Sequence, residues 1–126
     1  MNKRIWLMVV LAVWLVVMAC GVSDDLSGVR DTGKAFMTAL KDGDHAASYA
    51  MLSPGVQQEI GDMNAWVDFA TPRNFEEYSF SSTNIENGVG KLDGEATLQG
   101  DKYNINLVIE KFGEDWKITG LNFQLK

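Results

Sequence analysis

The hydrophobic pattern divides the chain into an uninterrupted apolar run and a longer part in which apolar residues recur periodically. Every residue from Ile5 to Ala19 is apolar, and the only charges before this run are Lys3 and Arg4. A basic start, an apolar core and small residues at its end are typical of a secretory signal. The run is long for a signal core and short for a membrane-spanning helix, so length alone does not separate a cleaved signal from an uncleaved anchor.

After the apolar run, apolar residues three and four positions apart indicate helices. Asp44 is suited to capping a helix, and Ser53 followed by Pro54 is a favourable helix start because proline lacks the N–H that the first turn leaves unpaired. Gly43 is a natural stop for the helix before it. The pattern predicts helices over Asp25 to Lys41 and His45 to Leu52, a third that begins at Ser53-Pro54, and a further turn over Asn64 to Phe69.

Beyond Pro72 the period changes to two, which is typical of β-strands. Asn87-Gly88 is a strong hairpin signal, and Gly100-Asp101 marks the next turn. In the last strand the apolar phase changes at Thr119-Gly120, so we expect a bulge at Gly120 to restore one buried face. The predicted strands run from about Tyr78 to Ile85, up to Leu98, from Tyr103 to Glu110 and from Trp116 to Leu125.

Helices followed by a meander of strands predict an α+β fold, with N-terminal helices packed on a curved antiparallel sheet of about four strands. The length of 126 residues allows one small domain. We therefore predict a signal segment or membrane anchor over residues 1–19, a tether over 20–25 and a single domain over 26–126.

The average charge of −6 conceals a sharp step along the chain. All 17 acidic residues and nine of the 11 basic ones follow Cys20, which gives that part a net charge of −8. An acidic domain does not neutralise phosphates, so we expect no nucleic-acid partner. The basic N-terminus and the positive-inside rule predict that the acidic part faces outside the cytoplasm, and its charge would be repelled from anionic lipid headgroups.

Cys20 is the only cysteine and His45 the only histidine. An internal disulfide is therefore impossible, and the usual His and Cys cages of zinc or iron–sulfur proteins are excluded, so we expect no metal and no cofactor. The segment Val17-Met18-Ala19 before Cys20 resembles a bacterial lipobox, although Met18 departs from the usual middle residue. The resemblance implies that Cys20 is the lipid-attachment site; an uncleaved anchor ending at Cys20, or simple secretion, are the alternatives.

Two stretches of the domain resemble the cystatin-like, nuclear transport factor 2-like superfamily. They are the string AFMTALKDGDHAASYAMLSP (residues 35–54), with Phe36, Gly43-Asp44, Tyr49 and Leu52-Ser53-Pro54 at matching places, and the ending DWKITGLNFQL (residues 115–125). The resemblance implies a cone-shaped roll with a pocket between helices and the concave sheet face. Many exported members are lipoproteins of unknown function, while others are enzymes such as ketosteroid isomerases, polyketide cyclases and scytalone dehydratase.

The residues do not reproduce a catalytic constellation, and we assign no catalytic residue. An enzyme of this type would need an acid or phenol in an apolar cavity, for which Asp68 and Tyr78 are the candidates. Capping or surface roles suit Asp68 better, and His45 beside the cap at Asp44 is expected to face solvent. The candidate pocket-lining residues are the aromatic ones expected on the inner faces, Phe36, Tyr49, Trp66, Tyr78, Phe80, Tyr103 and Trp116.

The sequence therefore predicts a membrane-tethered, extracytoplasmic domain that binds a protein partner or a small apolar ligand, and we expect binding rather than catalysis. The tether predicts contact with the membrane through the N-terminal lipid or anchor. Two alternatives stay open: a small pocket enzyme of the ketosteroid isomerase or polyketide cyclase type, and an accessory subunit of a membrane assembly. The latter predicts a large exposed apolar patch.

Overall fold

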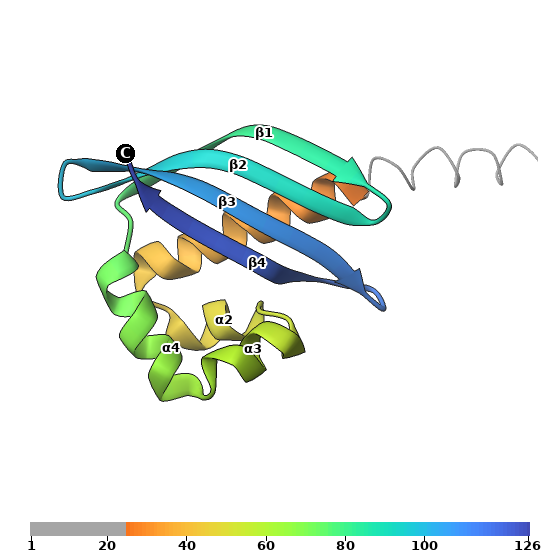
Figure 1. Cartoon of the computed structure of the whole chain (residues 1–126), viewed down its shortest axis with the longest axis horizontal. Helices are drawn as coiled ribbons and strands as arrows, with labels where there is room; N and C mark the ends of the chain where they lie inside the picture. Colours follow the sequence, from red (N-terminus) through yellow and green to blue (C-terminus); the bar gives the residue numbers. More distant parts are fainter. Residues whose placement is uncertain (1–24) are drawn as a thin grey trace, which may run out of the picture.

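The computed structural model describes residues 25–126, so the apolar run, most of the predicted tether and Cys20 lie outside the described residues. The described chain begins with a helix over 25–42, and Gly43 ends it with a φ of 71°. Three shorter helices and a 3-10 turn follow, which are α2 (His45–Ala50), α3 (Pro54–Ile60), α4 (Met63–Ala70) and η1 (Thr71–Arg73). Figure 1 shows the three short helices grouped beside one margin of the sheet.

The short helices begin where the sequence indicates. The carboxylate of Asp44 accepts a hydrogen bond from the Ala47 N–H at 3.1 Å, and the hydroxyl of Ser53 accepts one from the Val56 N–H at 3.3 Å. The second helix ends at Ala50, two residues earlier than predicted. The reason is a long-range contact, because Leu52 leaves the helix to form a parallel bridge with the last strand.

The second half of the chain is a four-stranded antiparallel meander in the order β1-β2-β3-β4. Its strands are β1 (Glu77–Glu86), β2 (Val89–Leu98), β3 (Asp101–Phe112) and β4 (Asp115–Leu125). Asn87 and Gly88 have φ values of 54° and 77° in the first hairpin. Two successive positive φ values match the twist of the flanking strands, which explains why Asn-Gly predicted this turn correctly.

Two bulges bend the sheet. Phe80 pairs with Gly94 and Ser82 with Asp93, so Ser81 is the extra residue of β1. In β4 the extra residue is Thr119, one position before the predicted Gly120. This bulge allows Ile118 and Leu121 to face the helices on the same side of the sheet, as the change of apolar phase required.

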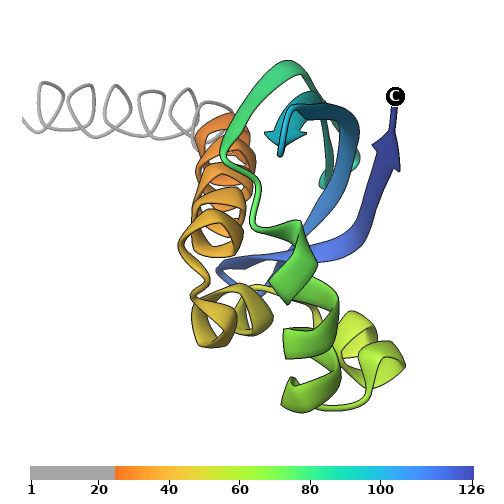
Figure 2. The same cartoon turned by 90° about the vertical axis from the view of Figure 1, so that its left-hand side faces the viewer.

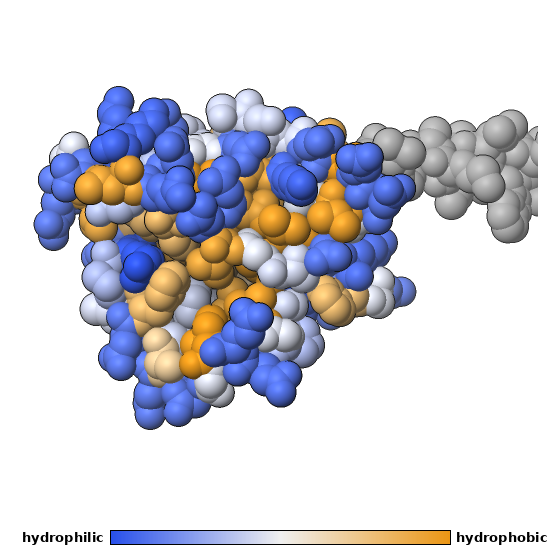
Figure 3. All heavy atoms as spheres, in the orientation of Figure 1, coloured by the Kyte–Doolittle hydropathy of each residue, from blue (hydrophilic) through white to orange (hydrophobic). Residues whose placement is uncertain are grey.

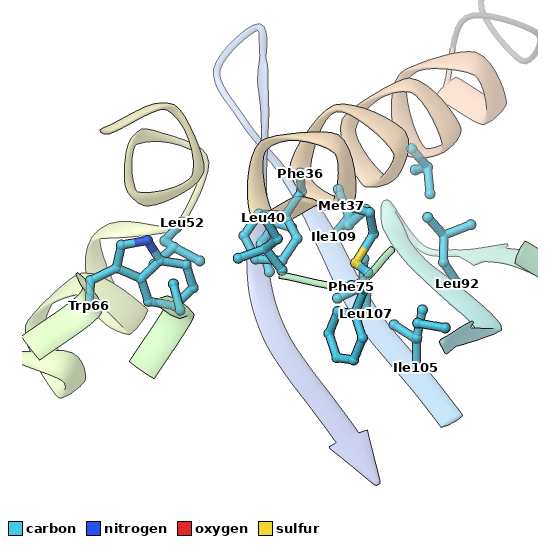
Figure 4. Packing of buried hydrophobic residues seen from close by; sticks show 14 residues of the cluster. Phe36, Met37, Leu40, Leu52, Trp66, Phe75, Leu92, Ile105, Leu107 and Ile109 are labelled. Atoms are coloured by element: carbon cyan, nitrogen blue, oxygen red, sulfur yellow. The ribbon is translucent and has the colours of Figure 1, made fainter. Parts of the chain in front are cut away.

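The concave face of the curved sheet wraps around the helix over 25–42 (Figure 2). Phe36, Met37 and Leu40 of that helix are at most 2% exposed. They pack against buried side chains of β2 and β3, and Figure 4 shows them pointing into the same layer. The sheet residues labelled there are Leu92, Ile105, Leu107 and Ile109. Side chains therefore fill the space between this helix and the sheet.

The opposite, convex face of the sheet is polar. The amide of Asn106 donates to the carboxylate of Asp93 at 2.6 Å, and Lys126 pairs with Glu95. The hydrogen bond and charge of Lys126 lower the pKa of Glu95 below its ordinary value. Polar cross-strand pairs of this kind are typical of a sheet face in contact with water.

Candidate binding groove

The seven aromatic residues predicted to line a pocket lie in separate parts of the domain. Phe36 is fully buried in the core, with its ring centroid 6.1 Å from that of Trp66. The ring of Tyr103 packs edge-on against Phe75 at 5.4 Å near the far end of the sheet. Tyr49 is half-buried against the core. These residues therefore pack in different parts of the domain, and they do not enclose a common cavity.

Tyr78 and Phe80 border a different hollow, between the first helix and β1. It has a volume of about 480 Å³ and polar walls that include Arg30 and Lys34. The hydroxyl of Tyr78 donates to the backbone oxygen of Lys34 at 3.1 Å and lies 2.9 Å from the Thr38 hydroxyl. These hydrogen bonds hold the Tyr78 side chain against the surface of the helix. The ring is packed, and the hydroxyl forms its polar end.

Trp116 covers the start of the described helix. A Cβ placed on Gly28 would lie 2.2 Å from the indole nitrogen of Trp116, so only glycine allows this approach. The ammonium of Lys111 lies 5.7 Å from the centre of the same ring. Trp116 therefore packs the first helix against the β3–β4 hairpin and is remote from the aromatic residues of α4.

Trp66 forms one wall of an apolar groove. Its indole N–H donates to the Ser48 hydroxyl at 2.8 Å, and Ser48 in turn donates to the His45 carbonyl at 3.1 Å. Its ring stacks on Phe69 with the centroids 5.4 Å apart. The polar end of the indole is thus satisfied inside the helical layer, and the ring, which is 0% exposed, lies behind the partly exposed side chains at the surface of the groove.

The groove lies between α3, α4 and β4 and has a volume of about 460 Å³. No residue of α3 is fully buried, and its apolar residues Val56 and Ile60 are only partly covered. The helix contacts β4 but leaves part of its apolar face uncovered, so the groove is open. Figure 3 shows apolar side chains gathered between the sheet and the short helices. The lining residues are Val56, Glu59, Ile60, Ala65, Trp66, Phe69, Thr119, Gly120 and Leu121.

The segment that contains the three short helices is acidic. Between Lys41 and Arg73 the sequence has five Asp or Glu residues and no Lys or Arg. All five are exposed, at Asp42, Asp44, Glu59, Asp62 and Asp68. Glu59 is the charged residue among those that line the groove, and the guanidinium of Arg73 lies 3.9 Å from the centre of the Phe69 ring. The carboxylate of Glu59, together with the net charge of −8 after Cys20, favours an occupant that combines apolar groups with positive charge.

The two side chains proposed for acid–base chemistry do not meet in a cavity. Asp68 is exposed on α4, and Tyr78 lies at the polar hollow beside β1. His45, expected to face solvent, is half-buried, and its backbone oxygen accepts the Ser48 bond. Within residues 25–126, no three His, Cys, Asp or Glu side chains gather in a way that would hold a metal ion. The described residues thus offer a groove for binding more clearly than a site for chemistry.

Sequence reasoning identified Trp66 and missed its neighbours. Val56 and Ile60, four residues apart on the third helix, have the spacing of an inner helix face, but the structure leaves them half-covered. Phe69 and Leu121 were not singled out. The change of apolar phase at Thr119-Gly120 was the available signal, because a bulge in an edge strand alters the spacing between that strand and the helix beside it.

Comparison with solved structures identifies the fold as nuclear transport factor 2-like. An NTF-2 like protein of unknown function from Silicibacter pomeroyi aligns with a TM-score of 0.64 at 13% identity, over 83% of this chain and 98% of its own. A second NTF2-like protein of unknown function, from Cytophaga hutchinsonii, aligns with a TM-score of 0.51 at 15% identity, over 78% and 89%. The fold class predicted from the sequence is confirmed. Both of these proteins are of unknown function, so the likeness to them does not indicate a reaction.

A candidate ketosteroid isomerase from Kribbella flavida also shares the fold, with a TM-score of 0.54 at 10% identity, over 81% of this chain and 80% of its own. Identity this low relates the folds alone, since one fold hosts many activities. The chain matches no known sequence family. It also matches no curated protein. Among residues 25–126, no helix is both long and apolar enough to span a membrane.

Proposed function

We propose that this protein is an exported, membrane-tethered binding domain that holds an apolar group of a ligand or partner protein in the groove between α3, α4 and β4. The observation that carries the proposal is the half-covered apolar face of α3 opposite Trp66 and Leu121. A short helix that leaves its apolar residues beside a groove gains stability when another apolar group covers them.

The tether belongs to the same proposal. The apolar run up to Ala19 and the lipobox-like residues before Cys20 support lipid attachment at Cys20, with the domain facing outside the cytoplasm. Asp25 follows Cys20 by five residues, a length of chain that reaches at most about 18 Å. An acylated Cys20 would therefore keep the domain close to the membrane surface while the groove stays available to a partner. The mass of the N-terminal fragment of membrane-extracted protein tests this part, because acylation and an intact Met1 give different masses.

Photocrosslinking in cells tests the groove. One variant of the full chain carries p-benzoylphenylalanine in place of Ile60, and a second variant carries it in place of Lys91 on the convex sheet face. We expect a discrete adduct from position 60 and none from position 91. Ala65→Phe fills the groove and should abolish the adduct, whereas Ala46→Phe on exposed α2 should preserve it. Equal labelling at both positions, or none at position 60, would contradict the proposal.

A further inference from the structure

One edge of the sheet lies beside the groove. β4 is the last strand in the sheet order, and its first half is covered by the chain before α3. There the Ile118 N–H donates to the Met51 carbonyl at 2.9 Å, and the Ser53 N–H donates to the Ile118 carbonyl at 2.8 Å. Within the described residues, no strand pairs with the second half of β4 on this side.

The backbone groups at this edge can be assigned from the hydrogen-bond pattern. The Lys126 N–H donates to the Lys102 carbonyl at 2.9 Å, so this is a hydrogen-bonded pair of the antiparallel ladder. Such pairs alternate with pairs whose N–H and C=O groups point away from the neighbouring strand. The backbone groups of Leu121, Phe123 and Leu125 therefore point outward at the free edge.

The second half of this edge lacks the features that usually prevent strands from associating. The segment from Leu121 to Leu125 contains no charge and no proline, and Leu125 is 61% exposed. The opposite edge, β1, has a bulge at Ser81 and a glutamate at each end. Charges, prolines and bulges are the devices by which edge strands are protected. β4 has a bulge at Thr119 and the charges of Asp115 and Lys117 in its first half, so only its second half lacks these devices.

The groove continues along this unprotected edge. Leu121 lines the hollow of about 460 Å³ beside α3 and α4, and Phe123 lines a second hollow of about 220 Å³ beside η1. Residues two apart on a strand face the same side and lie about 7 Å apart. Figure 1 shows β4 as the strand of the sheet nearest the short helices. A strand added to β4 would therefore direct alternate side chains toward these hollows.

We propose that the occupant of the groove is an extended segment of a partner protein that pairs with β4 at Leu121 to Leu125. Its alternate side chains are apolar and enter the two hollows, and it carries Lys or Arg because the chain after Cys20 has a net charge of −8 and Glu59 lines the groove. This inference rests on the proposed function and specifies the partner's conformation and charge. A second copy of the chain would bring another strongly acidic domain to the same wall, so charge favours a basic segment.

Amide exchange measured by nuclear magnetic resonance tests the inference on the full chain, labelled with ¹⁵N-leucine and ¹⁵N-phenylalanine, in phosphatidylcholine nanodiscs. The probe is the blocked peptide Lys-Val-Thr-Val-Thr-Val-Lys, and one control is the same peptide with N-methylated valines. We expect the first peptide to slow exchange at Leu121, Phe123 and Leu125 by about tenfold or more, because strand addition engages these N–H groups. The N-methylated peptide and a peptide with Glu at both ends should have no such effect.

Leu125→Pro provides the matched variant, because it removes one outward N–H from an exposed residue, and Leu125→Ala keeps that N–H. We expect the proline variant alone to lose most of the peptide's effect. Equal binding of the N-methylated peptide would show an apolar groove without strand pairing, and no effect of either peptide would refute strand addition; both overturn this inference. Concentration-dependent protection without peptide would identify a second copy as the occupant and also overturn it. For each of these outcomes, the photocrosslinking experiment at position 60 is a separate test of the proposed function.

Discussion

The buried hydrogen bond between Trp66 and Ser48 permits a quantitative test of how the groove wall is held. Both side chains are 0% exposed, and the indole N–H lies 2.8 Å from the Ser48 oxygen by donor–acceptor distance. Ser48→Ala removes the acceptor and leaves a polar N–H in an apolar layer. Such an unsatisfied group costs about 1–3 kcal/mol, and in a domain of this size about 2 kcal/mol lowers the Tm by roughly 8–16 °C.

Thermal unfolding of the full chain in detergent, followed by circular dichroism, measures this change. Trp66→Phe removes the N–H that needs an acceptor, so Ser48→Ala should cost much less in that background. We expect a coupling free energy of about 1–2 kcal/mol from the double-mutant cycle. Ser27→Ala, at an exposed position of the first helix, is the control and should leave the Tm nearly unchanged. A Tm of Ser48→Ala equal to that of the control, or equal losses in both backgrounds, would refute the reasoning.

Three further changes test other parts of the structure. Gly94→Ala places a Cβ 2.1 Å from the backbone oxygen of Ser79, so the strands must shift. We expect a loss of about 1–3 kcal/mol in urea unfolding, and an unchanged urea midpoint would contradict this close approach. Ser53→Ala removes the cap of α3 and should lower the free energy of unfolding by about 1 kcal/mol in the same assay. An unchanged urea midpoint would show that the cap does not stabilise the protein. Lys126→Gln should raise the pKa of Glu95 toward 4.5 in a carboxyl titration by nuclear magnetic resonance, because Lys126 is the main cause of its lowered value. Because the pKa of Glu95 is lowered in the folded state, the Lys126–Glu95 pair stabilises the protein above the ordinary glutamate pKa. This stabilisation is lost as the pH falls through the folded pKa. A titration of Glu95 that is unchanged by Lys126→Gln would contradict this role of Lys126.

Local chemistry made much of the fold predictable. Asn87-Gly88 fixes a hairpin through two adjacent φ values, and Ser53-Pro54 starts a helix through one side-chain bond and one missing N–H. Each of these features depends on residues that are close in sequence. The alternation of Tyr103 to Ile109 likewise identified the buried face of β3, because the period of a strand is independent of its neighbours.

The groove depends on contacts that the sequence does not reveal. The bridge between Leu52 and Ile118 joins segments 66 residues apart and determines where the second helix ends. It also positions α3 beside β4, so the coverage of Val56 and Ile60 depends on this distant pairing. Phe36 and Trp66 are both fully buried, as aromatic residues on an inner face would be. Periodicity does not reveal that a groove lies beside Trp66 and not beside Phe36.

The contact between the two ends of the domain has a consequence for the order of folding. Gly28 packs beneath Trp116, and Asp25 lies 3.9 Å from Lys111, so the first helix is completed by the last hairpin. Each strand of the meander pairs with its neighbour in the sequence, so the sheet can form soon after its residues have been synthesised. A ribosome adds about 5–20 residues per second, and the helix must therefore wait roughly 4–18 s for its partner strand. During that interval its apolar face is exposed, and we expect chaperones to recognise this segment, in addition to the apolar run before it, in the nascent chain.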